Sequence, residues 1–183
     1  MKRTFEDLMK IFVVIGMPAS GKNTARIYAE ARGIPYYATG DLVRREIRKR
    51  SLEHDAAAAA AVSTELRGAD GLGVTRLALA MAMESSADFL FMEGMRSQPE
   101  IDLIREKADC IVIAFLAPRQ LRLQRIVARQ RPDDSPQFFE ERDFREITYG
   151  AAVPIALADE YILNTGTLEE AVNQIDQIIS KRK

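Results

Sequence analysis

Residues 16–24, with the sequence GMPASGKNT, constrain the fold of this chain more than any other segment. They directly follow the continuous apolar run IFVVI at residues 11–15, which is typical of a strand buried on both faces. In the pattern G-x-x-x-x-G-K the glycines let backbone N–H groups turn towards a phosphate, the helix that follows adds its positive N-terminal dipole, and Lys22 reaches the β- and γ-phosphates. The segment therefore predicts a nucleotide-binding phosphate loop made of Gly16, Met17, Pro18, Ala19, Ser20, Gly21, Lys22, Asn23 and Thr24.

Short apolar runs alternate with longer helical patterns along the chain. The runs predict strands at residues 11–15, 34–38, 89–92, 110–116 and 161–163, and the segments between them predict helices. Strands separated by helices favour a parallel sheet with helices on both faces. Because no repeat or linker interrupts the pattern, we expect a single α/β domain with a five-stranded parallel sheet in the order 2-3-1-4-5.

Composition excludes several classes of protein. The 26 Lys and Arg residues and 27 Asp and Glu residues give a formal net charge of −1, so nucleic acid is not an expected partner. One cysteine, Cys110, and one histidine, His54, exclude an internal disulfide and a four-ligand Cys/His zinc cluster. No apolar run reaches the length of a membrane span, and the first seven residues carry acids where a secretory signal is apolar. We therefore expect a cytoplasmic protein with no membrane partner.

The phosphate loop itself resembles that of a known family. The residue after Lys22 is Asn23, and the hydroxyl usual at that position comes one place later, at Thr24. Adenylate kinases have the pattern G-x-P-G-x-G-K-G-T, which this loop matches at Pro18 and Thr24. Ala19 and Asn23 stand where that family has glycines.

Two further segments resemble the acceptor site of adenylate kinases. Residues 39–44, TGDLVR, are similar to the S-T-G-D-x-x-R segment, which implies that Thr39 faces the acceptor base, that Arg44 binds its phosphate and that Asp41 belongs to the same site. Residues 93–96, EGMR, resemble the motif D-G-F-P-R, one residue shorter. This likeness implies that Arg96 is a second arginine for the acceptor phosphate.

Two other segments resemble kinases near the donor nucleotide. Residues 125–129, RIVAR, are similar to the R-I-V-G-R stretch that leads into the lid, which implies that Arg125 and Arg129 grip the donor phosphates. Residues 158–168, ADEYILNTGTL, resemble the ending of dephospho-coenzyme A kinases, in which the loop after the last strand packs near the donor adenine. This second likeness implies a cofactor-binding role for Asn164 and Gly166.

From residue 11 onward the chain resembles an archaeal family described as adenylate-kinase-related. The resemblance implies the P-loop NTPase fold of the nucleoside monophosphate kinase type, with ATP and Mg²⁺ as cofactors. It also implies one domain over residues 1–183, an acceptor-binding helical insertion at about residues 41–86 and a short lid at about residues 131–138. It constrains the fold and the donor more narrowly than the acceptor.

Arginine is concentrated between residues 119 and 145, and positive charge is what phosphoryl transfer requires around a dispersed negative charge. We favour Arg125 and Arg129 because they are nearest to the expected lid, and we expect about half of the set to be solvated because acids are interleaved with it. We do not assign Arg67 to the expected site, because the helix dipole alone favours a cation at a helix C-terminus. The seven arginines are Arg119, Arg122, Arg125, Arg129, Arg131, Arg142 and Arg145.

Three polar residues have candidate roles beside the phosphates. Glu93 ends an apolar strand, where an acid orients Mg²⁺-bound water, and Thr24 is a second candidate for the metal. Asp41 either caps the helix that follows it or, for a hydroxyl acceptor, serves as the general base. A phosphate acceptor needs no base.

The expected function is transfer of the ATP γ-phosphate to a nucleoside monophosphate or a similar small metabolite. In this reaction the negative charge of the phosphates would be stabilised by Lys22, Arg96, Arg125 and Arg129. Two alternatives stay open at this point. One is hydroxyl phosphorylation of the dephospho-coenzyme A kinase kind, which requires Asp41 as base. The other is slow ATP hydrolysis as a switch in macromolecular assembly, which requires a protein partner.

Overall fold

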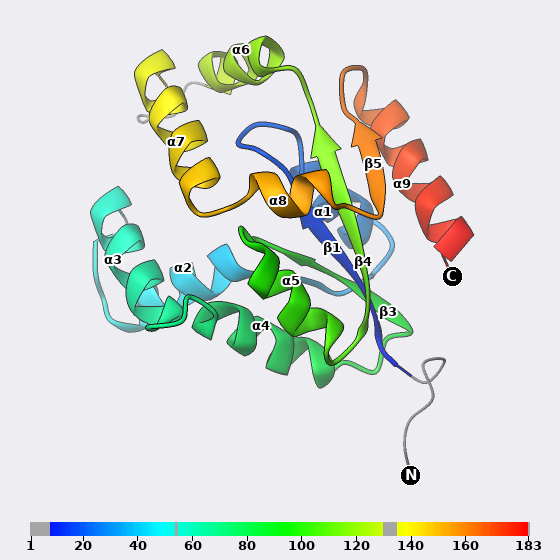
Figure 1. Ribbon diagram of the computed structural model, residues 1–183, viewed down its shortest axis with the longest axis horizontal. Coiled ribbons are helices and arrows are strands. Elements are labelled where there is room, and N and C mark those ends of the chain that lie inside the picture. The colour runs from blue at the N-terminus through cyan, green and yellow to red at the C-terminus, as the bar shows by residue number, and fades with distance from the viewer. Residues whose placement is uncertain (1–7, 54, 130–134, 183) are drawn as a thin grey trace.

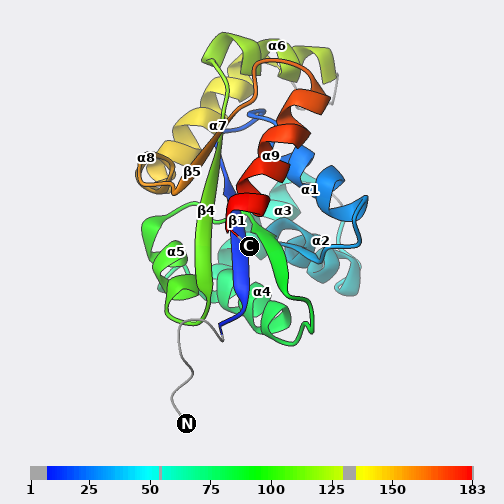
Figure 2. The same cartoon turned by 90° about the vertical axis from the view of Figure 1, so that its right-hand side faces the viewer.

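The computed structural model describes residues 8–53, 55–129 and 135–182 and shows a twisted sheet between layers of helices (Figures 1 and 2). Neighbouring strands pair in parallel in the order β2-β3-β1-β4-β5. The predicted fold class and strand order are therefore confirmed. The strands are β1 Lys10–Ile15, β2 Tyr36–Ala38, β3 Phe89–Glu93, β4 Asp109–Leu116 and β5 Glu160–Leu163.

The helices follow the predicted pattern with one addition. The short helix α8 lies just before the last strand, and its five residues are too few to produce a periodic pattern. Of the expected lid, residues 131–134 lie outside the described part of the chain, and Pro136 opens α7. The helices are α1 Asn23–Glu30, α2 Thr39–Lys49, α3 Ala56–Arg67, α4 Gly73–Met83, α5 Gln98–Arg105, α6 Arg119–Arg129, α7 Pro136–Thr148, α8 Ala152–Ala156 and α9 Leu168–Arg182.

Strand β1 is the centre of the core because helices cover both of its faces. Phe12 and Val14 pack in one apolar cluster with residues of α1 and α9, and Ile11, Val13 and Ile15 pack in another with residues of α4 and α5. Figure 2 shows α5 on one side of β1 and β4, and α1 and α9 on the other. Side chains alternate between the faces of a strand, so a strand covered on both sides needs a continuous apolar run.

Helices α2, α3 and α4 have a smaller core of their own. Val43, Ile47, Val62 and Val74 are buried together there, which joins these three helices into one unit at the β2 side of the molecule. This unit contains most of the expected acceptor insertion, residues 41–86. No helix in the described part of the chain is long and apolar enough to cross a bilayer.

Phe91 provides a test of the core. Its side chain is fully buried, and the ring centroids of Phe12, Tyr28, Tyr36 and Phe89 lie 5.6–6.4 Å from its own. We expect Phe91→Ala to lower the free energy of unfolding by about 3–5 kcal/mol in urea denaturation, because it leaves a cavity. Phe144→Ala is the control: Phe144 is 73% exposed, and a loss of more than about 0.5 kcal/mol there would contradict this packing.

Candidate functional site

A cavity of about 320 Å³ lies at the carboxyl ends of β1 and β3. Ligands bind in open α/β sheets at this edge, where neighbouring strands lead into loops that turn to opposite faces. Figure 1 shows the β1–α1 loop between α1 and the pair α6 and α7. The lining comes from the phosphate loop, the segment after β3 and helix α7. The polar lining side chains are Lys22, Glu93, Arg96, Arg142, Arg145 and Glu146.

The backbone of residues 16–24 has the shape that the glycine pattern predicts. Gly16 and Gly21 have φ values of 147° and 96°, and a Cβ at Gly21 would lie only 1.7 Å from Nδ2 of Asn164. Ala19, which stands where adenylate kinases have a glycine, also has a positive φ, 59°. A side chain in this left-handed region costs roughly 1–2 kcal/mol, so the loop retains a strained conformation there.

Lys22 lies across the phosphate loop. Its Nζ donates hydrogen bonds to the backbone oxygens of Gly16, at 2.7 Å, and Met17, at 3.2 Å. Burial in the cavity lowers the pKa of Lys22, and the nearby carboxylates of Glu93 and Glu146 oppose that shift. A partly buried ammonium that is bonded to carbonyl oxygens can exchange these partners for phosphate oxygens, which are stronger acceptors.

The donor set fits a nucleotide phosphate and a magnesium ion. The hydroxyl of Ser20, a residue of the phosphate loop, is buried and has no hydrogen-bond partner among the described residues. No group of three His, Cys, Asp or Glu residues in the described ranges could hold a metal by itself. Magnesium beside nucleotide phosphates usually takes only one or two protein ligands and completes its shell with water and phosphate oxygens. Of the two expected magnesium ligands, Glu93 lines the cavity, whereas Thr24 is a buried residue of α1 that does not line it.

Glu93 is oriented from the edge of the sheet. It is the last residue of β3, opposite Val14 of β1 and Ala38 of β2, and it accepts a 2.9 Å hydrogen bond from the hydroxyl of Tyr36. Burial and the neighbouring Glu93 carboxylate raise the pKa of Tyr36, so this phenol stays a donor. The contact holds one carboxylate oxygen of Glu93 in a defined direction.

Arg96 is held by two acids as it enters the cavity. Its backbone N–H donates to Oε2 of Glu100 at 2.7 Å, and its Nε lies 3.3 Å from Oε2 of Glu146 on α7. Glu100 is fully buried and also accepts from the hydroxyl of Thr75 at 2.7 Å. These contacts connect the acceptor-side helices, the segment after β3 and α7 at one arginine.

Arg67 lies in the same region, although no sequence motif marks it as a site residue. Its guanidinium carbon is 5.5 Å from the ring centre of Tyr149, and that of Arg96 is 5.4 Å from the same ring. Arg67 also lies 3.8 Å from the buried carboxylate of Glu100. Its position at a helix end had an explanation in the helix dipole, and only the packing of α3 brings it to Arg96.

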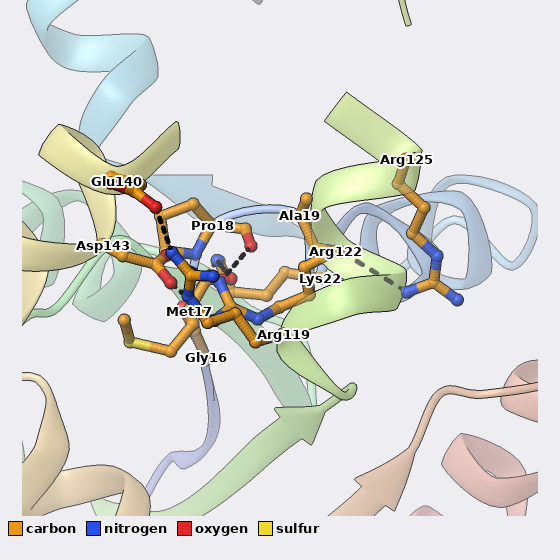
Figure 3. A network of polar contacts seen from close by, with 10 residues as sticks. All are labelled: Gly16, Met17, Pro18, Ala19, Lys22, Arg119, Arg122, Arg125, Glu140 and Asp143. Atoms are coloured by element: carbon orange, nitrogen blue, oxygen red, sulfur yellow. Dashed lines mark hydrogen bonds and ion pairs between the residues drawn. The ribbon is translucent and has the colours of Figure 1, made fainter. Parts of the chain in front are cut away.

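Arg125 and Asn164 contact the outer side of the phosphate loop. Arg125 Nη1 lies 3.3 Å from the carbonyl oxygen of Ala19 (Figure 3). It also lies 3.4 Å from the carbonyl oxygen of Ser20, while Arg125 Nη2 donates to the backbone oxygen of Asn164 at 2.8 Å. Asn164 Nδ2 in turn donates to the Ser20 oxygen at 2.9 Å. Neither side chain lines the cavity.

The arginines that line the cavity come from α7. Arg129 is an exposed residue at the end of α6 and does not line the cavity, whereas Arg142 and Arg145 do. The sequence favours the two arginines nearest the expected lid, whereas the arginines that line the cavity lie further along the same segment. The rotation of α7 decides which arginines line the cavity. Residues 142, 145 and 146 share one face of this helix, and that face is turned towards the cavity.

The predicted acceptor residues divide between two places. Thr39 is buried against Gly94, where a Cβ would lie 2.0 Å from its Oγ1, next to the phosphate-loop cavity. Asp41 instead lines a second cavity of about 290 Å³ between β2, α2 and α4, and its carboxylate accepts hydrogen bonds from Arg26, at 2.6 Å, and Arg44. Partial burial acts to raise the pKa of Asp41, but the two arginines outweigh burial and hold that pKa below its usual value.

Gly166 lies in the β5–α9 loop and is separate from the phosphate-loop cavity. It lines a shallow groove together with residues of β5 and α9, and a Cβ there would lie 1.8 Å from Oε2 of Glu170. Glu170 also accepts from the Thr167 backbone N–H while Thr167 Oγ1 accepts from the Glu170 N–H. This reciprocal pair begins α9 and needs a glycine beside it.

Comparisons with known proteins agree with this geometry. The model of a family described as AAA domain matches residues 15–140. The chain is 33% identical over 178 residues to a UPF0200 protein of Methanosarcina mazei, with 94% of this chain and 95% of that protein covered. It is 36% identical over 183 residues to a UPF0200 protein of Thermococcus kodakarensis, with 93% and 99% covered.

Solved structures show the same fold. A shikimate kinase from Acinetobacter baumannii, in complex with shikimate, superposes with a TM-score of 0.60 at 19% identity and covers 98% of this chain and 97% of its own. A Thermus thermophilus protein superposes with a TM-score of 0.70 at 17% identity, covering 97% and 100%. The fold is thus that of small P-loop kinases.

Gly21 tests the phosphate loop. We expect Gly21→Ala to weaken Mg-ATP binding at least about tenfold in calorimetric titration, because the new Cβ would displace Asn164 and distort the loop backbone. Gly33→Ala is the matched control: its φ is also positive, at 65°, but nothing lies within 4 Å of the added Cβ. Equal ATP affinity in the two variants would contradict this reading of the loop.

Proposed function

The chain belongs to the AAA-domain family whose model it matches and to the UPF0200 proteins, and from this premise we propose that it is an ATP-dependent small-molecule kinase. In the proposed reaction, an oxygen of the acceptor forms a bond to the γ-phosphorus of ATP while the bond from that phosphorus to the β–γ bridging oxygen breaks, and ADP leaves. The proposed acceptor is a nucleoside monophosphate or a similar small phosphate-bearing metabolite.

The charge of the cavity is the observation that carries this proposal. Four cationic side chains line it, Lys22, Arg96, Arg142 and Arg145, against two acids, Glu93 and Glu146, which leaves two positive charges in excess. A site of this kind stabilises several phosphate groups brought together, and phosphoryl transfer depends mainly on such stabilisation. The phosphate loop at one wall and Arg96 at another provide separate places for donor and acceptor.

Each residue has a role that follows from its place. Lys22 binds the β- and γ-phosphates of the donor, and Arg96 orients the acceptor. Arg142 and Arg145 approach from α7 and balance charge between the two. Thr24 and Glu93 hold Mg²⁺, directly or through water. The bound ion supplies neutralisation of the charge that develops on the donor phosphates. Arg125, Asn164 and Gly166 support the donor side by shaping the loop and the segment after β5.

The surroundings of Asp41 support a phosphate acceptor over a hydroxyl acceptor. A general base needs a free carboxylate with a pKa near the working pH. The carboxylate of Asp41 is bonded to Arg26 and Arg44, which hold its pKa low, and it does not line the phosphate-loop cavity. We therefore assign Asp41 to ordering the segment around Thr39 and Arg44.

Water exclusion by two moving segments is part of the proposal. The acceptor helices, within about residues 41–86, and the short lid, at about residues 131–138, would close over the bound substrates. Such closure protects the phosphoryl group from hydrolysis. The separate small core of α2, α3 and α4 supports movement of that unit as a body.

Lys22→Ala tests the donor site. We expect it to lower the turnover of Mg-ATP at least about a hundredfold, the usual effect of removing a central electrostatic donor. Lys107→Ala, on an exposed residue that follows α5, is the control and should keep the wild-type rate. An unchanged rate in Lys22→Ala would remove this lysine from the reaction.

Arg96→Ala and Asp41→Asn together distinguish the two acceptor chemistries. For a phosphate acceptor we expect Arg96→Ala to lower kcat/KM for the acceptor about a hundredfold, because the arginine binds its charge, and Asp41→Asn to have the smaller effect. The measurement is steady-state kinetics with the acceptor varied at saturating Mg-ATP. If Asp41→Asn abolishes turnover while Arg96→Ala does not, the acceptor is a hydroxyl.

The acceptor is identified by ADP production from Mg-ATP, alone and with AMP, CMP, UMP, GMP, dTMP or dephospho-coenzyme A. A large increase with one nucleoside monophosphate supports the proposal and names the substrate. An increase with dephospho-coenzyme A alone points to hydroxyl phosphorylation. A slow rate that none of the compounds changes contradicts a metabolic kinase and favours an ATP-dependent switch with a protein partner.

A further inference from the structure

Helix α7 is joined to α6 by a buried ion pair. Nη1 and Nη2 of Arg122 each lie 2.6 Å from one carboxylate oxygen of Asp143, and the two side chains are only 7% and 10% exposed (Figure 3). The ring of Phe139 packs 5.1 Å from the same guanidinium. A bidentate ion pair of this kind fixes the relative orientation of the two side chains as well as the distance between them.

The same guanidinium also contacts the phosphate loop. Nη1 of Arg122 donates to the backbone oxygen of Pro18 at 3.0 Å, in addition to its bond to Asp143. One side chain of α6 therefore holds both the phosphate loop and α7. Figure 3 shows Arg122 between Pro18 on one side and Asp143 on the other.

Asp143 sets which face of α7 meets the cavity. Successive residues of a helix point about 100° apart, so fixing residue 143 towards α6 directs residues 142, 145 and 146 together towards one side. Those three residues line the phosphate-loop cavity. A rotation of α7 about its axis would move the two arginines and Glu146, the partner of Arg96, out of the cavity together.

A net gain in folding free energy does not explain why a buried ion pair stands at this position. Removing two charges from water has a large desolvation penalty, and well-packed apolar residues often serve as well in such a position. What apolar residues cannot supply is a direct bond from the α7 anchor to a carbonyl of the phosphate loop.

We propose that Arg122 and Asp143 are positioning residues that couple the conformation of the phosphate loop to the orientation of α7. A nucleotide that orders the phosphate loop at Pro18 thereby also holds Arg142 and Arg145 over the phosphates of that nucleotide. The proposal rests on the proposed function for the identity of the loop ligand, and it adds a mechanical connection between that ligand and the helix that contributes half of the cavity's cations.

The chain contains a matched control for this pair. Arg119 and Glu140 form an ion pair of 3.0 Å between the same two helices, one turn earlier, but both side chains are more than half exposed. No hydrogen bond from Arg119 to the phosphate loop occurs among the described residues. The double variant Arg119→Met with Glu140→Leu therefore removes an α6–α7 ion pair and leaves the loop contact in place.

The first experiment measures coupling without turnover. Amide hydrogen exchange in residues 136–148 is followed before and after addition of Mg²⁺ with adenylyl imidodiphosphate, an ATP analogue with a stable β–γ link. We expect exchange to slow about threefold or more in wild type and in the Arg119/Glu140 variant, but not in Arg122→Met with Asp143→Leu. Equal slowing in all three proteins, or no slowing in wild type, would overturn the coupling.

The second experiment is a double-mutant cycle on kcat/KM with Arg142→Ala in each background. In wild type and in the Arg119/Glu140 variant we expect Arg142→Ala to cost about a hundredfold, and in the Arg122/Asp143 variant less than about threefold beyond the loss already present. Additive losses would mean that the pair supports the fold and does not position Arg142. Thermal unfolding of each variant separates this effect from loss of stability.

Arg122→Lys serves if the double replacement does not fold. A lysine keeps the charge but cannot hold Asp143 with two bonds and Pro18 with a third, so it should lose the nucleotide-dependent slowing in α7 while remaining folded. Retained slowing in Arg122→Lys would count against the proposal. Failure of the proposed kinase function is recognised separately, as slowing of α7 by the nucleotide without transfer to any acceptor.

Discussion

The parallel pairing of β1 with β3 on one side and β4 on the other is the constraint on which the rest of this structure depends. Val14 lies opposite Glu93, and Ile15 lies opposite Ala114, so three chain segments leave the sheet at the same edge. The segments are the phosphate loop, the Glu93–Arg96 segment and the connection to α6. Because β1 is buried on both faces, a shift of its register by one residue would exchange its side chains between two packed clusters of different shape.

Contacts from distant parts of the chain then shape the phosphate loop from outside. Pro18, Ala19 and Ser20 each offer a backbone oxygen that accepts a hydrogen bond from Arg122, Arg125 or Asn164. None of the three donors lines the phosphate-loop cavity. The donors fix the loop without occupying its inner face, and they help to maintain the positive φ of Ala19, which its own sequence disfavours.

The fold could be predicted from the sequence because each of its signals is local. Continuous apolar runs mark buried parallel strands, and glycine with lysine at the end of the first run marks a phosphate loop. The site could be predicted only in part. Arg125 and Arg142 belong to one arginine-rich segment, and no local pattern shows that the first contacts the back of the loop while the second lines the cavity. Arg67 was missed for the same reason, since its contact with Tyr149 joins residues far apart in the chain.

The sequence by itself determined the architecture of this protein and the place of its phosphate loop, because hydrophobic periodicity and backbone freedom are properties of short segments. Only the tertiary structure decided which cations share the cavity. That choice depends on how α7 is rotated against α6, where Asp143 is paired with Arg122 in a buried contact. The two residues are 21 positions apart, and neither is distinguished in the sequence from its charged neighbours.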